Sequence, residues 1–158
     1  MNEEDDVKIG LISDTHGLLR PEAVEALRGS ALILHAGDIG RSDLIGELEQ
    51  IAPVQAIRGN IDRESWALRY PETRVVEVAG ARILMLHDVN ALAIDPADDG
   101  IDVVISGHSH RPSIEHRDDV LYLNPGSAGR RRFSLPISVA RIDAGATGIE
   151  ATIIYLDV

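Results

Sequence analysis

The sequence predicts an α/β domain with two stacked mixed β-sheets and helices on their outer faces. Two observations support this class. In the first part of the chain, short segments that are apolar almost throughout alternate with helical patterns, which is typical of parallel strands covered on both faces. In the second part, apolar segments come in pairs joined by short turns, which is typical of antiparallel hairpins. The 158 residues contain no linker, internal repeat or low-complexity tract, so residues 1–158 are expected to form one domain.

The first part of the chain is expected to run strand–helix–strand–helix–strand. The three strands are apolar and cover residues 7–13, 31–36 and 54–58. A helix over 21–28 has Pro21 in its first turn, where proline is favoured. A helix over 41–52 has apolar residues at helical spacing and Ser42 available as its cap. This order predicts a parallel sheet.

The second part is expected to contain mainly antiparallel strands. Residues 74–86 form a predicted hairpin that turns at 79–81, and residues 112–124 form another that turns at 117–119. The remaining elements are a short helix over 91–98 and strands over 102–106, 136–143 and 149–156, the last two joined by a turn at 144–148.

Composition narrows the chemistry that the chain can perform. A net charge of −11 and a pI near 4.8 oppose stable binding to nucleic acid, and one Trp, one Phe and three Tyr leave few rings for stacking on bases. The absence of cysteine excludes disulfides, cysteine-ligated metals and thiol catalysis, so a metal site would use His, Asp, Asn or Glu. The acidic start MNEEDDVK is no secretory signal, and no apolar run reaches the ~18 residues of a membrane span. We therefore expect a cytoplasmic protein without a membrane partner.

Polar side chains that can bind metal follow five of the predicted strands. They are Asp14 and His16, Asp38, Asn60, His87, and His108 with His110. Because the ligands of open α/β sheets bind outside the carboxyl ends of the strands, these seven side chains are expected to meet at one edge. Each short segment alone is typical of a turn, since Gly-Asp and Gly-Asn are common turn sequences. Their combination at five strand ends, which includes four of the six histidines, instead predicts a metal site.

Seven ligands are too many for one ion and suit two. Two divalent ions, two aspartates and one hydroxide sum to a local charge of about +1, which attracts a phosphate. Ions that share a carboxylate and a hydroxide, roughly 3.5–4 Å apart, are used for in-line displacement at phosphorus. Mixed imidazole, carboxylate and amide ligands suit Mn²⁺, Zn²⁺, Fe²⁺ and Ni²⁺, of which we expect Mn²⁺.

The motif set resembles that of the calcineurin-like metallophosphoesterases. DTH at 14–16, GDI at 37–39, GN at 59–60, His87 after a strand and GHSH at 107–110 occur in the order of that family. The short chain, NPGS at 124–127 and the antiparallel finish are similar to its small single-domain phosphodiesterases. The resemblance implies a four-layer αββα sandwich of two stacked mixed sheets flanked by helices. It also implies hydrolysis of a small phosphate ester, expected to be a diester, by a hydroxide that bridges two metals.

The resemblance further assigns roles to individual residues. One ion would be held by Asp14, His16, Asp38 and His110, and the other by Asp38, Asn60, His87 and His108. Asp38 would bridge the two ions. Asp38, Asn60 and His108 are the residues implied to act in catalysis.

Two further histidines and two serines are expected to have structural roles. His35, inside a strand, is predicted to be a buried structural histidine, and His116 a solvated one beside a turn. Ser127 does not occur in the G-x-S-x-G order of a hydrolase nucleophile, so we expect it to serve a turn. Ser109 is expected to point away from its ligand neighbours.

The arginines at 130–132 have two interpretations. Basic triplets are usually solvated, and that alternative stays open here. These residues follow NPGSAG, however, a turn whose N–H groups can form an anion-binding concavity in an otherwise acidic protein. We therefore predict that Arg130 and Arg131 contact the substrate phosphate.

Other functions remain open at this point. The retromer subunit of the same family resembles a protein-interaction scaffold with an incomplete ligand set, whereas this chain fills all seven positions. A mononuclear hydrolase and a nucleotide-binding fold are further alternatives, and the absence of G-x-G-x-x-G after the first strand disfavours the latter. A homo-oligomer is compatible with the sequence.

Two positions depart from the family pattern. Larger relatives carry a proton-donating histidine after Gly-Asn, where this chain has Ile61, with the neighbouring acid kept as Asp62. Close relatives often have His-Gly-His where this chain has His87-Asp88-Val89. Neither isoleucine nor valine can protonate a leaving group.

These departures predict a preference for esters whose leaving group departs with little protonation, such as aryl esters and certain phosphodiesters. We expect the rate to fall steeply as the leaving-group pKa rises across a series of aryl phosphodiesters, because no side chain at 61 or 89 donates a proton. The slope of log kcat/KM against leaving-group pKa measures this, and a flat plot would contradict it.

Overall fold

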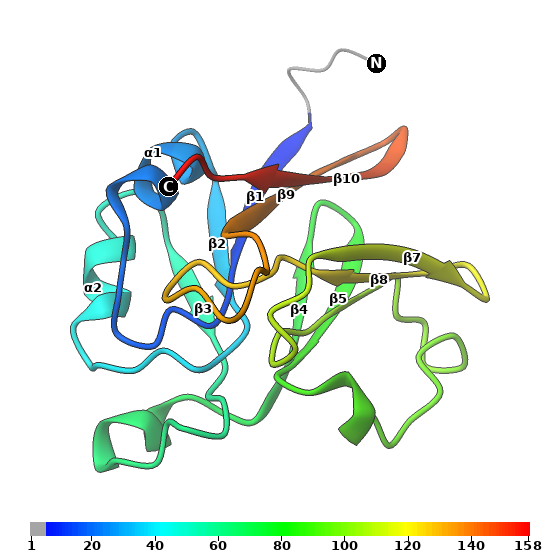
Figure 1. Ribbon diagram of the computed structural model, residues 1–158. Coiled ribbons are helices and arrows are strands. Elements are labelled where there is room, and N and C mark those ends of the chain that lie inside the picture. Colours follow the sequence, from blue (N-terminus) through cyan, green and yellow to red (C-terminus); the bar gives the residue numbers. More distant parts are fainter. Residues whose placement is uncertain (1–5) are drawn as a thin grey trace.

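The computed structural model describes residues 6–158, and in these residues ten strands form two five-stranded sheets (Figure 1). The expectation that the chain has no secretory signal falls largely on residues 1–5, which lie outside the described part. No helix within residues 6–158 is long and apolar enough to cross a membrane.

The first sheet has the order β10-β9-β1-β2-β3. Its parallel strands are β1 (Val7–Ile12), β2 (Leu32–His35) and β3 (Val54–Ala56), and β9 (Ser138–Gly145) and β10 (Gly148–Tyr155) add antiparallel strands beside β1. The helices α1 (Pro21–Leu27) and α2 (Leu44–Leu48) bury Leu27, Leu44 and Leu48 against the outer face of this sheet (Figure 1). The predicted strand–helix order and parallel pairing are confirmed.

The second sheet has the order β4-β5-β6-β8-β7. Its elements are β4 (Thr73–Val78), β5 (Ala81–Leu86), β6 (Val103–Ile105), β7 (Ser113–Arg117) and β8 (Val120–Asn124). The centre β5-β6-β8 is parallel, and the hairpins β4-β5 and β7-β8 supply the antiparallel edges. Both hairpin turns have positive φ at their two central residues, Ala79-Gly80 and Asp118-Asp119, which is the geometry that suits two-residue hairpin loops.

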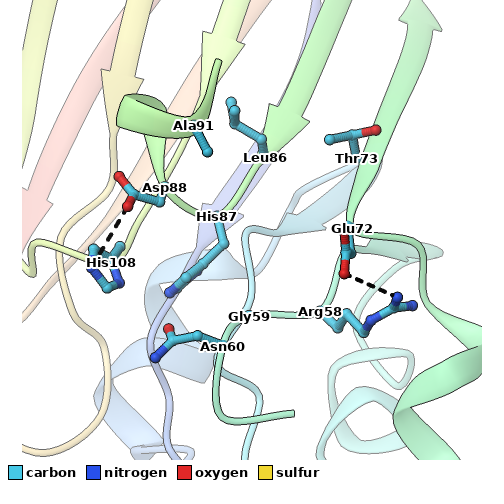
Figure 2. Close-up of a pocket in the computed structure, with 10 residues that line it drawn as sticks. All are labelled: Arg58, Gly59, Asn60, Glu72, Thr73, Leu86, His87, Asp88, Ala91 and His108. Carbon is cyan, nitrogen blue, oxygen red and sulfur yellow. Dashed lines mark hydrogen bonds and ion pairs between the residues drawn. The ribbon is translucent and has the colours of Figure 1, made fainter. Parts of the chain in front are cut away.

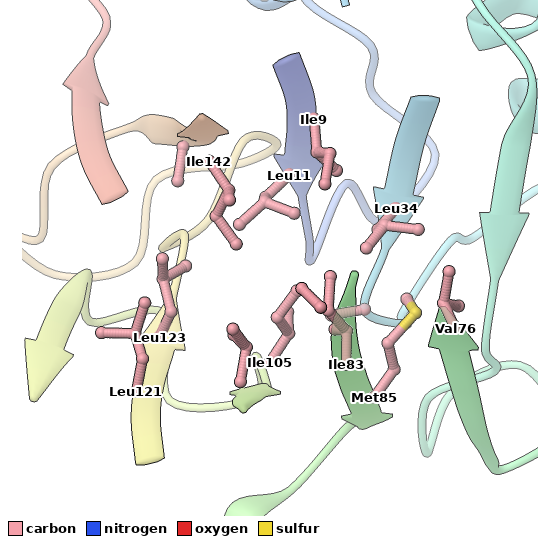
Figure 3. Packing of buried hydrophobic residues seen from close by; sticks show 14 of the residues in the cluster. Ile9, Leu11, Leu34, Val76, Ile83, Met85, Ile105, Leu121, Leu123 and Ile142 are labelled. Atoms are coloured by element: carbon pink, nitrogen blue, oxygen red, sulfur yellow. The ribbon is translucent and has the colours of Figure 1, made fainter. Parts of the chain in front are cut away.

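The main core lies between the two sheets (Figure 3). Because side chains alternate along a strand, every second residue of β1 and β5 points into this layer, including Ile9 and Leu11 from one sheet and Ile83 and Met85 from the other. All four are fully buried. The apolar layer therefore holds the strand ends of the two sheets in a defined position relative to each other.

The helix predicted over 91–98, on the outer face of the second sheet, is wrong. A 3-10 turn, η3 (Val89–Ala91), is followed by coil instead, and Val89 and Leu92 pack over Leu84 and Val104. The cause is Asp95-Pro96, since the residue before proline disfavours the helical region and the Asp95 side chain accepts the N–H of Ala97 at 3.1 Å. The α/β sandwich itself is confirmed, with this segment forming its fourth layer.

The predicted helix over 41–52 is also shorter in the structure, where α2 covers only Leu44–Leu48. Gly46 weakens the helix from within, and Pro53 disfavours helical geometry at the residue before it. A second 3-10 helix, η2 (Ser65–Arg69), lies in the connection between the two sheets.

Candidate metal centre

Four strand ends bring the predicted ligands to one edge of the sandwich. Asp14 and His16 follow β1 and Asp38 follows β2, while His87 follows β5 and the pair at 108 and 110 follows β6. Within the described residues, two groups could each hold an ion: Asp14 with His16 and His110, and Asp14 with Asp38 and His87. In each group the ligand atoms lie within 4.8 Å of one another. Five of the seven predicted ligands are thus close together.

The two carboxylates face the imidazoles through one oxygen each. Asp14 Oδ1 lies 3.8 Å from His16 Nε2, 3.7 Å from His87 Nε2 and 3.4 Å from His110 Nε2. Asp38 Oδ2 lies 3.4 Å from His16 Nε2 and 3.2 Å from His87 Nε2. The imidazoles therefore surround a pair of carboxylate oxygens contributed by neighbouring strands.

The remaining polar atoms of Asp14, Asp38 and His87 are held by hydrogen bonds. Asp14 Oδ2 accepts from Ser13 Oγ at 2.8 Å and from the N–H of His108 at 3.1 Å, and Asp38 Oδ1 accepts from the N–H of Ile61 at 3.1 Å. His87 Nδ1 donates to the carbonyl of Ala36 at 2.8 Å, which leaves Nε2 as the unprotonated atom when the ring is neutral. Such outer contacts orient each side chain so that its free atom points inward.

Several atoms of this cluster are buried without a hydrogen-bond partner. Asp14 Oδ1, His16 Nε2 and His87 Nε2 are buried without one, and so is His110 Nδ1. Buried polar atoms in proteins are almost always satisfied, so a cluster that leaves several unsatisfied and facing one another calls for a missing partner. Carboxylate oxygens and imidazole nitrogens in this arrangement fit a divalent transition metal.

The backbone at the ligands is strained. Nine non-glycine residues among 6–158 have positive φ, and five are predicted ligands: Asp14, His16, Asp38, His108 and His110, with φ between 47° and 70°. Non-glycine residues in this region are uncommon and occur preferentially at functional sites. Backbone hydrogen bonds hold these residues in place. The N–H of Asp14 donates to the carbonyl of Gly37, and the N–H of His16 donates to the carbonyl of Asp38.

Two glycines let the ligand loops approach closely. A Cβ at Gly59 would lie 2.1 Å from Asp38 Oδ1, and one at Gly107 would lie 2.5 Å from Asp14 Oδ2. Neither glycine has positive φ, so both are required by contact rather than by backbone conformation. Gly37 is required for both reasons. Its φ is 103°, and a Cβ at this position would also clash with His87.

The mutual contacts shift the pKa of each central group. Burial raises the pKa of Asp14, but the neighbouring imidazoles of His110 and His16 outweigh it and hold the pKa well below its ordinary range. Burial also raises the pKa of Asp38, and the close contact with His87 and its charge reverse this effect. Burial lowers the pKa of His87, but Asp38 and Asp14 raise it to about 9. Without metal, a proton on His87 thus offsets part of the carboxylate charge.

Comparison with known proteins agrees with this chemistry. Residues 7–147 match the calcineurin-like phosphoesterase superfamily domain. The chain belongs to this superfamily. It is 41% identical over 148 residues to a probable metallophosphoesterase of Methanothermobacter thermautotrophicus, and the alignment covers 85% of this chain and 86% of that protein. It is 32% identical over 138 residues to a phosphodiesterase of Methanocaldococcus jannaschii, which covers 76% of this chain and 83% of that protein.

Two solved structures share the fold. An archaeal phosphodiesterase superposes with a TM-score of 0.77 at 26% identity, over 94% of this chain and all of that one. The protein Vps29 of Chaetomium thermophilum superposes with a TM-score of 0.76 at 20% identity, over 96% and 98% of the two chains. At that identity, the likeness to Vps29 concerns the fold alone.

The other two predicted ligands of this phosphoesterase domain lie on the outer side of the cluster. Asn60 and His108 line a pocket of about 350 Å³ together with His87 (Figure 2). The His108 ring centroid is 5.2 Å from that of His87, and its Nε2 is 3.9 Å from Asp88 Oδ2. The His108 side chain is 45% exposed. Both residues therefore lie beside the cluster and line the pocket next to it.

Asp62 has a role that the sequence did not indicate. Its buried carboxylate accepts the N–H groups of Ile39 at 3.0 Å, Gly40 at 3.0 Å and Gly59 at 2.9 Å. It thereby fastens the loop that carries Asp38 to the loop that carries Asn60. Its position two residues after Gly-Asn suggested a remnant of a proton-donor pair, whereas both of its oxygens accept backbone N–H groups.

His35 is the buried structural histidine that the sequence predicts. Its Nδ1 accepts the N–H of Gly37 at 3.1 Å, so Nε2 carries the proton and donates to Thr15 Oγ1 at 3.0 Å, and Thr15 donates on to the carbonyl of Ile39 at 2.8 Å. Burial lowers the pKa of His35 to about 4, which keeps it neutral. This chain of bonds supports the strand ends under both aspartates.

The two serines also have the predicted structural roles. Ser127 Oγ donates to the carbonyl of Asp14 at 3.1 Å, and Ser109 Oγ accepts from Asn124 Nδ2 at 3.1 Å, away from the ligands. His116 is exposed on β7, as expected.

The arginines after the NPGS turn do not line the pocket beside the cluster. Arg131 donates to the carbonyls of Leu135 at 3.2 Å and Val158 at 2.9 Å, which ties its own loop to the end of the chain. Arg130 is exposed. It follows Gly129, whose backbone packs against the carbonyl of Thr15 between two predicted ligands. The arginine that does line the pocket is Arg58, which the sequence did not single out.

Metal binding by this centre should release a proton from His87. The metal-free imidazole is protonated near neutral pH because its pKa is about 9, and an ion requires the neutral ring. Calorimetry in buffers of different ionisation enthalpy should show about one proton more released at about pH 7.5 than at about pH 10, with apparent affinity rising over that interval.

The His87→Gln variant should lose this step, and His116→Gln, which changes an exposed histidine on β7, should retain it. An identical proton count at both pH values in the unaltered protein would contradict the assignment.

Proposed function

We propose that the protein is a metal-dependent phosphoesterase, most directly a phosphodiesterase, that uses two divalent ions. The observation that carries this proposal is the set of buried, unpartnered atoms on Asp14, His16 and His87 beside a pocket. Family membership and the phosphodiesterases among the relatives support the same conclusion. We further propose Mn²⁺ as the ion, which is one of the divalent metals that mixed oxygen and nitrogen ligands suit.

The proposed ligand sets are those that the family resemblance assigns. Asp14, His16, Asp38 and His110 would hold one ion, and Asp38, Asn60, His87 and His108 the other. The place of Asp38 supports its role as the bridge, because its Oδ2 lies 3.4 Å from His16 of the first set and 3.2 Å from His87 of the second. Bound ions would supply an activated water and neutralise the charge that develops on the phosphate.

The chain's own residues would position the substrate. Asn60 and His108 face the pocket and can contact a phosphate oxygen or an ion from that side. Ser127 and the buried carboxylate of Asp62 hold the loops, so that the ligands need not move when a substrate binds. Pre-positioned groups of this kind lower the reorganisation needed in the transition state.

Protonation of the leaving group has no dedicated imidazole in this proposal. Ile61 is 44% exposed next to the cluster, and Val89 packs into the outer apolar layer with Leu84. Both positions are occupied by side chains that cannot donate a proton, which supports a preference for esters with good leaving groups.

A protein-interaction module on the same fold is the second candidate. The similarity to Vps29 structures supports it at the level of fold. The ligand set of this chain is complete, whereas a scaffold has no need of buried, unsatisfied imidazoles and carboxylates, and this difference favours the enzyme.

Replacement of the bridging carboxylate should abolish turnover. In Asp38→Asn the amide oxygen can still accept the N–H of Ile61, so the fold is expected to persist while the negative charge between the two ligand sets is lost. We expect kcat for bis(p-nitrophenyl) phosphate to fall by at least about a hundredfold. Asp98→Asn, at an exposed position, is the matched control.

Metal content by elemental analysis and the thermal unfolding midpoint complete this comparison. Retained turnover in Asp38→Asn, with a normal midpoint, would refute the proposed mechanism. Absence of both metal and turnover in the reconstituted unaltered protein would favour the interaction module.

The substrate phosphate is proposed to contact Arg130 or Arg131. Alanine at either position should raise KM several-fold with little change in kcat, because the lost contact acts on the bound phosphate rather than on the reaction. Arg28→Ala is the control. Arg28 follows α1 and lies near the start of β1, whereas the ligands lie beyond the carboxyl ends of the strands. Unchanged KM and kcat in the alanine variants at positions 130, 131 and 132 would contradict this contact and would favour the alternative that these arginines are only solvated.

A further inference from the structure

The pocket beside the candidate metal centre extends beyond what metal and phosphate need. One side is formed by the predicted ligands His87, Asn60 and His108, and the opposite side by Leu86 and Ala91 (Figure 2). Its volume of about 350 Å³ lies in the range of small-molecule sites. Since the ligands form one wall, a group attached to a phosphate at the centre would pass directly into this space.

The charges at the rim of the pocket show which group it suits. Arg58 Nη2 lies 3.3 Å from Glu72 Oε1, and its Nη1 donates to the carbonyl of Tyr70 at 2.6 Å. Asp88 lies at the other end, so the three charged side chains sum to −1. A second phosphate or carboxylate on the ligand would therefore find no net attraction here.

The apolar wall and the polar rim together suit an uncharged ring. Leu86 and Ala91 offer an apolar face, and Thr73 and Arg58 lie beyond it with hydrogen-bonding groups. The Glu72 side chain is 78% exposed, so its ion pair with Arg58 is weak and a ligand can share the guanidinium donors.

We propose that this pocket binds the organic arm of the phosphate ester, and that the arm is an uncharged ring system such as an aryl or nucleoside group. The place of the phosphate rests on the proposed function. The selection of the arm rests on the apolar wall and on the charge of the rim.

Binding of two phosphonates to the Mn²⁺-loaded protein tests the proposal without turnover, because their carbon–phosphorus bond is not hydrolysed. Phenylphosphonate should bind about tenfold more tightly than methylphosphonate by calorimetry, since part of its ring is buried against Leu86 and Ala91. In Ala91→Gln a polar side chain covers this wall, and the two affinities should come within about twofold of each other. Ala93→Gln, at an exposed position two residues further on that does not line the pocket, should keep the full ratio.

The outcomes separate this proposal from the proposed function. Equal affinities in the unaltered protein, or a ratio that survives in Ala91→Gln, would overturn the ring-binding pocket alone. Failure of both phosphonates to bind would overturn the phosphate site and the pocket together. A ratio that is lost only in Ala91→Gln would support the pocket even if no diester were hydrolysed.

Discussion

The buried carboxylate of Asp14 is the group on which the rest of the site depends. An uncompensated charge in a protein interior is strongly destabilising, so its partners must be built into the fold. One oxygen accepts hydrogen bonds from Ser13 and from the backbone of His108, and the other faces three imidazoles. Those imidazoles follow β1 in one sheet and β5 and β6 in the other. The apolar layer between the sheets therefore has an electrostatic consequence. It holds His87 and His110, which belong to the second sheet, against the carboxylate of Asp14, which belongs to the first.

The rigid ligand loops require backbone conformations of high local free energy. Five ligands hold positive φ, and residues in such regions carry a cost of about 1 kcal/mol or more each. The surrounding contacts over-determine the geometry. Asp62 binds three backbone N–H groups across two ligand loops, His35 and Thr15 form a chain of hydrogen bonds beneath them, and Gly59 and Gly107 permit backbone approaches that any Cβ would block. The strained residues thus remain in place because the second layer of contacts, rather than their own propensity, decides their conformation.

The part of this arrangement that the sequence could predict is the part with a strong local signal. Apolar strands followed by Asp, Asn or His place all seven candidate ligands at strand ends, since strand boundaries and side-chain types are both visible in the sequence. Conformations decided by distant contacts were not visible. The helix over 91–98 failed because Asp95-Pro96 forms a turn, and positive φ at the ligands depends on bonds such as that from Asp14 to Gly37. Arg58 had no motif around it, and its place in the pocket wall follows from its hydrogen bonds to the carbonyls of Tyr70 and Pro71, in the segment that leads into β4.

Metal binding and protonation compensate the same charges in this fold. In the metal-free protein, His87 with a pKa of about 9 supplies a positive charge next to Asp14 and Asp38, which makes the cluster tolerable without an ion. A divalent ion takes over that function and requires the proton to leave. The ligand atoms converge in the structure, so a bound ion would exchange the His87 proton for a larger positive charge at the same place. With two ions bound, the proposed site would carry a local charge of about +1, which would attract a phosphate in spite of the chain's net charge of −11.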